Sequence, residues 1–188
     1  MIDSRSVGDA GCFLSFETLE ARRQNLPPAP RDTGTLTRVM SRGVGGVRQL
    51  LDETVLTVQG GVPGDSWGRS RSPDPEAQLA VMQEDIARLI ANGQPLELSG
   101  DNLWLDLDLS SANLPAGTRL AVGEAILEST PLPHDGCKKF RARFGADALR
   151  FVATPPLRHL NLRGIYLRVV QDGRVRVGDT VRKLPCDA

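Results

Sequence analysis

From Leu36 onward, short runs of β-branched and apolar residues alternate with turns that contain glycine, proline or asparagine. Runs bounded in this way are typical of β-strands. The runs span residues 36–41, 54–58, 78–82, 119–122, 125–129, 165–170 and 174–177. A succession of short strands with few helices predicts a mainly β fold: a closed or nearly closed β-barrel with a few short helices.

A period of two marks residues 103–109, where four leucines alternate with Trp104 and two aspartates. This alternation predicts a strand that buries one face and exposes the other to water. We therefore interpret Asp106 and Asp108 as part of a wet strand face and not as paired catalytic acids. The turns at 123–124 and 171–173 predict hairpins between the runs on either side of them.

Three segments have the pattern of helices. Ser15 is placed to cap a helix over residues 16–25, which a proline-rich segment then ends. Residues 83–91 carry apolar side chains at helical spacing, and residues 147–153 precede two further prolines.

Two segments lie outside the strand pattern. We expect residues 1–35 to form an N-terminal extension that contains the first of these helices. Residues 67–76 are rich in serine, proline and arginine, so we expect an exposed loop of the kind that can cover a site.

The charge balance limits the classes of partner. The chain has 23 lysines and arginines and 23 acidic residues, and this net charge of zero argues against nucleic-acid binding, which depends on neutralising phosphates. A net charge of zero is still compatible with a local cationic patch that binds a small anionic ligand. We expect no contact with a membrane, because the chain has no run of about 18 apolar residues.

Cysteine usage indicates the compartment. The three cysteines, an odd number, predict free thiols and not a disulfide framework, so we expect a reducing, cytoplasmic location. Cys12 and Cys186 lie near the ends of the chain, and we interpret them as incidental.

Residues 131–145 carry the most unusual chemistry in the sequence. Cys137 follows two prolines and a glycine, and four cations follow it within six positions: Lys138, Lys139, Arg141 and Arg143. Cationic neighbours favour the thiolate, which is the reactive form of cysteine. Such a thiol suits a nucleophile, a persulfide carrier or a soft-metal ligand, and the same cations suit an anionic cofactor group such as phosphate.

Other interpretations of this segment stay open. Cys137 can be a structural cysteine beside a solvated basic turn. His134 can polarise the thiol or take its proton, or it can be exposed and idle. A cysteine hydrolase would have only His134, Asp135 and His159 as candidates for its base and orienting acid. A second cysteine close by is missing, so the sequence does not support a zinc site or a CxxC redox motif.

A series of short motifs is spread along residues 64–181. The motifs are Gly64-Asp65, Gly100-Asp101-Asn102-Leu103, Leu114–Leu120, Val122–Ala125, Gly136–Phe140, Arg143-Phe144-Gly145, Arg163–Tyr166 and Arg176–Val181. In their order and spacing they resemble the MOSC domain, which is found at the C-terminus of molybdenum-cofactor sulfurases and as stand-alone bacterial proteins. The resemblance runs from about Leu36 to Leu184. It implies a MOSC-type β-barrel over residues 36–188, after the extension at 1–35.

The resemblance also implies roles for individual residues. Cys137 is the family's hallmark cysteine: in sulfurases it is thought to carry sulfur as a persulfide to the molybdenum cofactor, and in the amidoxime-reducing relatives it ligates molybdenum. The residues that would bind the cofactor, chiefly its pterin phosphate, are Lys138, Lys139, Arg141, Arg143 and Asn102. At the position of Gly100, those relatives often have an arginine.

Two hypotheses follow from the resemblance. In the first, the protein binds molybdenum cofactor or carries sulfane sulfur on Cys137, acting as a sulfur transferase or as a molybdenum-dependent reductase of N-hydroxylated compounds. Its partners would be a cysteine desulfurase, a molybdoenzyme or an electron-transfer protein. Pyridoxal phosphate would enter only through that desulfurase, since the chain is too short to include such a domain. In the second, the barrel is a non-catalytic module that binds a pterin or another anion, and Cys137 is structural.

Overall fold

The computed structural model describes residues 2–185, so Cys186 lies outside the described residues. At its centre is a closed barrel of seven strands, in the order β10-β6-β7-β8-β4-β5-β1 and back to β10. Neighbouring strands are antiparallel, except for the parallel pair β4–β5. The strands are β1 (Thr33–Arg42), β4 (Leu79–Gln83), β5 (Leu103–Asp106), β6 (Arg119–Val122), β7 (Ala125–Ser129), β8 (Ile165–Gln171) and β10 (Thr180–Lys183). The predicted closed β-barrel is therefore confirmed.

Three further strands lie outside the ring. β2 (Arg48–Leu51) pairs with β1, and β3 (Glu53–Leu56) pairs with β9 (Gly173–Arg176) in a separate two-stranded sheet. The hairpin predicted around residues 171–173 is wrong. β8 already has β7 on one edge and β4 on the other, so it has no free edge for β9. The hairpin of β6 and β7 is confirmed.

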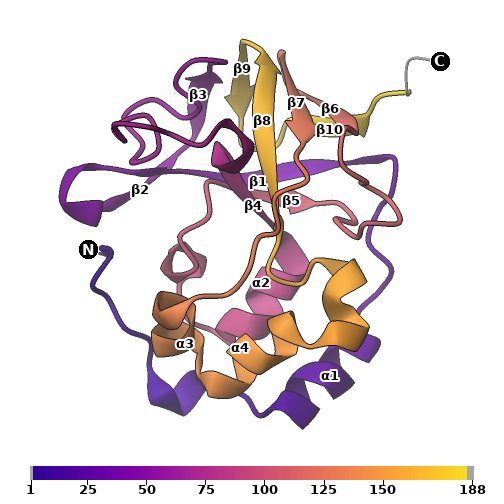
Figure 1. Ribbon diagram of the computed structural model, residues 1–188. Helices are drawn as coiled ribbons and strands as arrows, with labels where there is room; N and C mark the ends of the chain where they lie inside the picture. The colour runs from indigo at the N-terminus through magenta and orange to yellow at the C-terminus, as the bar shows by residue number, and fades with distance from the viewer. Residues whose placement is uncertain (1, 186–188) are drawn as a thin grey trace.

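The α-helices of residues 2–185, four in number, gather below the barrel (Figure 1). They are α1 (Phe16–Gln24), α2 (Glu84–Ala91), α3 (Lys138–Phe144) and α4 (Ala146–Ala153). The first, second and fourth match the three predicted helices, and the Ser15 side chain caps α1 by accepting the Thr18 N–H. α3 was not predicted, and it begins directly after Cys137.

The core has two parts. One fills the barrel, with leucines and valines that alternate inward along the strands. The other lies between the outer barrel wall and the helices, and it contains Trp104. The prediction of a wet strand face is therefore wrong at Trp104, which is fully buried. The helices cover this face, and only at Asp106 does the strand become exposed.

The N-terminal residues pack onto the rest of the molecule. Leu19 of α1 is fully buried among the helices. β1 begins at Thr33, so this strand includes position 35. The predicted boundary between an extension at 1–35 and a domain at 36–188 stays a prediction. Among residues 2–185, every helix is too short or too polar to cross a membrane.

Candidate functional site

The thiol of Cys137 lies on the rim of a cavity of about 560 Å³. Seven separate parts of the chain line this cavity: Ser4, the segment from the end of β1 to the start of β2, the loop at 66–69, Ala80 of β4, Ser99-Gly100, the segment around Cys137, and the chain at the start of β8. Cys137 is exposed and immediately precedes α3, and its carbonyl accepts the Arg141 N–H at 3.0 Å. The fold thus presents an accessible thiol to a cavity.

Six cationic side chains line the cavity: Arg42, Arg48, Arg69, Lys139, Arg143 and Arg163. Two of them are neutralised by buried aspartates. Arg42 binds Asp65 through two nitrogens, at 2.7 and 2.9 Å. Arg163 binds Asp101 at 2.8 Å, and the Asp101 side chain is fully buried. Burial alone would raise the pKa of Asp101, but the charge of Arg163 outweighs it, so the pKa lies below its usual value.

The other arginines of the cavity donate to main-chain carbonyls instead. Arg48 binds Glu97 O, Arg69 binds the carbonyls of residues 64 and 42, and Arg143 binds those of residues 4 and 6. Carbonyls orient a guanidinium without cancelling its charge. In the part of the chain that the structure describes, no carboxylate pairs with these three arginines or with Lys139. A chain with zero net charge therefore concentrates uncompensated positive charge beside one thiol.

The lowered pKa values of Arg48 and Arg143 reflect this concentration of positive charge. Burial and the nearby charge of Arg143 lower the pKa of Arg48 to about 10, and burial also lowers the pKa of Arg143. Both side chains remain charged at neutral pH. An anion between them would relieve their mutual repulsion.

His134 forms part of the cavity wall and its side chain is buried, so the expectation that it is solvent-exposed is wrong. Its ring packs on Tyr166 with the centroids 4.3 Å apart, and its Nε2 lies 3.8 Å from Asp101 Oδ1. Burial, together with the charge of Arg163, lowers the pKa of His134 to about 3. The imidazole is therefore neutral at pH 7 and is a weak proton acceptor. Its role in catalysis stays a prediction.

Of the three hydrolase candidates, His134 and Asp135 line this cavity within the described residues, and His159 does not. His159 is exposed and lines a different cavity. Asp135 is exposed and lies 4.0 Å from Arg158. The acid that approaches His134 is Asp101, which is already paired with Arg163.

Unsatisfied polar atoms gather at the same cavity. Four buried side-chain polar atoms among residues 2–185 have no hydrogen-bond partner. Three of the four, Ser99 Oγ, His134 Nδ1 and Arg163 Nε, belong to cavity-lining residues. Buried polar groups in folded proteins are rarely left unpaired, so this grouping is typical of a site that is completed by a ligand.

The structure separates the four cations that follow Cys137. Lys139 and Arg143 are four residues apart on α3 and both line the cavity. Lys138 and Arg141 are exposed and do not line it. The sequence interpretation treated these residues as one basic turn, and it missed the helix that divides them.

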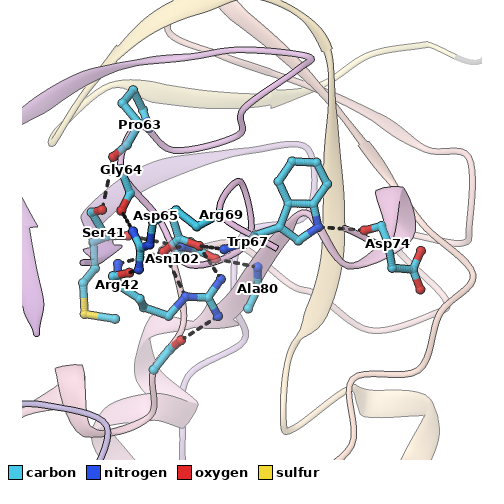
Figure 2. Close-up of polar contacts among 12 residues, drawn as sticks. Ser41, Arg42, Pro63, Gly64, Asp65, Trp67, Arg69, Asp74, Ala80 and Asn102 are labelled. Carbon is cyan, nitrogen blue, oxygen red and sulfur yellow. Dashed lines mark hydrogen bonds and ion pairs between the residues drawn. The ribbon is translucent and has the colours of Figure 1, made fainter. Parts of the chain in front are cut away.

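Asn102 lies outside the cavity and contacts a residue that positions one of the cavity arginines. Its side chain is fully buried and does not line the cavity. The amide donates to Asp65 Oδ2 at 3.0 Å and to Met40 O, and its oxygen accepts the Ala80 N–H. Figure 2 shows that Asp65 in turn binds Arg42. Asn102 therefore holds the aspartate that orients a cavity arginine.

The loop after Asp65 is tied to the same network (Figure 2). Asp65 accepts the Trp67 N–H at 2.9 Å, and the Trp67 indole donates to Asp74 O at 2.7 Å. Ser66 and Arg69 of this loop line the cavity. The expectation of an exposed loop near a site agrees with this placement.

Sequence reasoning missed four of the six cavity cations: Arg42, Arg48, Arg69 and Arg163. No local signal marks them, because they come from three separate segments, 42–48, 69 and 163, and only the fold brings these together. The environment of Cys137 was visible in the sequence because the glycine and the lysines are its direct neighbours.

The side chains alone do not form a metal centre. Within residues 2–185, no three His, Cys, Asp or Glu side chains are grouped so that they could hold a metal ion. A metal at Cys137 would therefore need most of its ligands from a bound cofactor.

Comparisons with known proteins give one family match and several structures with a similar fold. The family model of the MOSC domain matches residues 68–182. The fold is similar to that of YuaD from Bacillus subtilis, with 18% identity over 82% of this chain and 97% of that one and a TM-score of 0.59. It is also similar to YiiM from Escherichia coli, with 19% identity over 86% and 72% of the two chains and a TM-score of 0.52. A search of curated proteins finds no significant match.

Proposed function

The chain belongs to the MOSC domain family, and from this premise we propose that its cation-lined cavity binds the molybdenum cofactor beside Cys137. One observation carries the proposal: an exposed thiol lies on the rim of a cavity in which four of the six cations have no acidic partner among residues 2–185. The family relates to the C-terminal domains of molybdenum-cofactor sulfurases, and the cavity's chemistry suits an anionic, phosphate-bearing ligand.

The residues fit this cofactor in three ways. The uncompensated arginines offer planar donors for phosphate oxygens. The unpaired Arg163 Nε is a buried donor, and the unpaired Ser99 hydroxyl can donate or accept. Cys137 offers one soft ligand, and this suits a metal that brings its other ligands with it.

The chain's own residues would each have a defined task. Arg48, Arg69, Lys139 and Arg143 would hold the anionic end of the ligand. Cys137 would ligate the metal or receive sulfur. His134, neutral at pH 7, would serve as a hydrogen-bonding wall and not as a base. When bound, the cofactor would supply two-electron redox chemistry, such as the reduction of N-hydroxylated compounds with electrons from a partner protein.

The pterin content of the purified protein tests the cavity. Wild-type protein from cells that make the cofactor should release close to one pterin per chain on denaturation, measured by fluorescence. Arg69→Gln should retain about tenfold less, because it removes a charged hydrogen-bond donor from the cavity. Arg69→Lys, which keeps the charge, should retain more than Arg69→Gln.

The matched control is Arg71→Gln. Arg71 is an exposed residue of the same loop and does not line the cavity, so this variant should equal wild type. Absence of pterin from the wild type would reject the proposal, as would equal losses in the Arg69 and Arg71 variants.

A sulfur-carrying role is a second candidate, and the exposure of Cys137 favours it, because sulfur transfer requires contact between two proteins' sulfur atoms. The Cys137 thiolate would attack the outer sulfur of a persulfide on a separate cysteine desulfurase. A new S–S bond forms on Cys137, the donor's S–S bond breaks, and the donor cysteine leaves as a thiolate.

Intact mass measures this transfer. After incubation with a desulfurase and free cysteine, the wild type should gain the mass of one sulfur atom, which a thiol reductant removes. Cys12→Ser should gain it and Cys137→Ser should not. If Cys137→Ser gains the same mass, sulfur transfer through this residue is excluded.

A further inference from the structure

Gly100 marks a particular place in the cavity. Its φ of +84° is in the left-handed region that favours glycine. A Cβ at this position would lie 3.4 Å from Arg48 Nη2 and 3.6 Å from Arg143 Nη1. Two guanidinium groups from distant segments therefore converge over a residue without a side chain.

Neither arginine has an acidic partner in the described chain, and both point donors into a shared space. The Arg48 Nη1 atom is held by Glu97 O, whereas Nη2 is the atom nearest to Gly100. Arg143 uses Nε and Nη2 on main-chain carbonyls, which leaves Nη1 toward Gly100. A pair of planar guanidinium groups with free N–H donors matches the oxygens of a tetrahedral anion.

The N-terminal segment, residues 2–8, holds both arginines. The Ser4 and Ser6 carbonyls accept the Arg143 guanidinium at 2.9 and 3.3 Å, and the Ile2 carbonyl accepts the Arg48 N–H at 3.0 Å. The segment is fastened to α3 where the Gly8 N–H donates to Ala142 O at 3.1 Å. A Cβ on Gly8 would lie only 1.8 Å from Arg143 O, so only glycine lets the N-terminal segment come this close to α3.

We propose that Arg48 and Arg143 form an oxyanion-binding cradle over Gly100, and that residues 2–8 hold this cradle in its binding geometry. The ligand class is a phosphate monoester, and this assignment rests on the proposed function, whose cofactor ends in such a group. Arg48 and the N-terminal segment both lie outside residues 68–182, which the family model matches. The cradle also differs from the sequence-based assignment of phosphate to the consecutive cations after Cys137.

The test is a titration of the full-length protein, made in cells that do not synthesise the cofactor, with inorganic phosphate followed by ³¹P NMR. Arg48→Gln should raise the dissociation constant about tenfold or more, since it removes a charged hydrogen-bond donor. Arg182→Gln, at an exposed arginine that does not line the cavity, makes the same charge change and should leave the constant within twofold.

Gly8→Ala tests the N-terminal segment without altering any cavity side chain. The added methyl group must push the segment away from α3, so phosphate affinity should fall severalfold while circular dichroism stays that of wild type. Gly11→Ala is the matched control, because a Cβ there meets only the Asp9 side chain, at 3.3 Å. Wild-type affinity in Gly8→Ala would refute the role of the segment even if Arg48→Gln behaves as expected.

Methyl phosphate, titrated in parallel, distinguishes the source of the anion. Binding at least as tight as that of inorganic phosphate supports a monoester ligand. Exclusion of methyl phosphate would overturn this assignment in favour of a free ion. Equal weakening in the Arg48 and Arg182 variants would overturn the cradle itself, whatever the pterin content. Phosphate binding as predicted, in a protein that takes up no pterin, would leave the cradle standing and reject the proposed function.

Discussion

His134 and Cys137 are three residues apart, yet their surroundings differ. The Cys137 thiol is exposed at the mouth of the cavity, whereas the imidazole of His134 is buried between Tyr166 and the Arg163–Asp101 pair. The sequence placed both in one reactive segment. It predicted the unusual environment of the cysteine, but it could not predict the burial of the histidine, which depends on strand β8.

The buried histidine makes stability depend on pH. Its pKa falls from 6.5 in the unfolded chain to about 3 in the fold, so the unfolded state binds the extra proton between these values. The contribution of the neutral histidine to stability is therefore present above about pH 6.5 and is lost as the pH falls toward 3. Between pH 7 and pH 5 we expect the free energy of unfolding to drop by about 2 kcal/mol, measured by urea denaturation.

The chain offers a matched control for this prediction. Replacing the buried histidine in His134→Gln should remove most of the pH dependence. His159→Gln, at the chain's other histidine, should keep it, because that side chain is exposed. The same pH dependence in both variants would mean that another group titrates in this range.

Among the structural elements, the loop between β3 and β4 depends on one carboxylate. Asp65 accepts hydrogen bonds from the main chain and side chain of Arg42, from the Trp67 N–H and from Asn102 (Figure 2). Burial would raise the pKa of Asp65, but the bonds from Arg42 more than offset it, and the pKa is lowered. The loop is therefore fixed against the cavity.

Removing this carboxylate should be costly. Asp65→Ala leaves Arg42 and Asn102 without their partner, and we expect a loss of about 3 kcal/mol in the free energy of unfolding. Asp74→Ala, at an exposed aspartate that only caps the turn at 75–77, should cost about 1 kcal/mol or less. Chemical denaturation measures the free energy of unfolding of both variants, and an equal decrease in the two would contradict the structural role of Asp65.

Elements with a strong local signal were predictable. Periodicity, caps and prolines identified α1, α2 and α4, and glycine-bounded runs identified most strands. α3 was missed, because it follows a proline-rich turn and four of its seven residues are cationic, so only Phe140 and Phe144 mark its apolar side. The pairing of β9 with β3 was also hidden, since only the complete ring shows that β8 has no free edge.

Across the whole molecule, the closed barrel gathers charges that are far apart in the sequence. Strand content predicted the barrel, but the register and order of the strands determine that Arg42, Arg48, Arg69 and Arg163 line one cavity. The N-terminal residues, interpreted from the sequence as an extension, contribute Ser4 to the wall. The site therefore extends beyond the segment that carries the cysteine.

We propose that Cys137 and this cavity act together on one molybdenum-bearing ligand. The most direct measurement is the molybdenum content per chain of wild type, Cys137→Ser and Cys12→Ser, each purified from cells that are supplied with molybdate and make the cofactor. We expect close to one molybdenum per chain in wild type and in Cys12→Ser, and a loss of most of it in Cys137→Ser. A wild type without molybdenum, or a Cys137→Ser variant that retains all of it, would show that Cys137 does not hold the metal in this cavity.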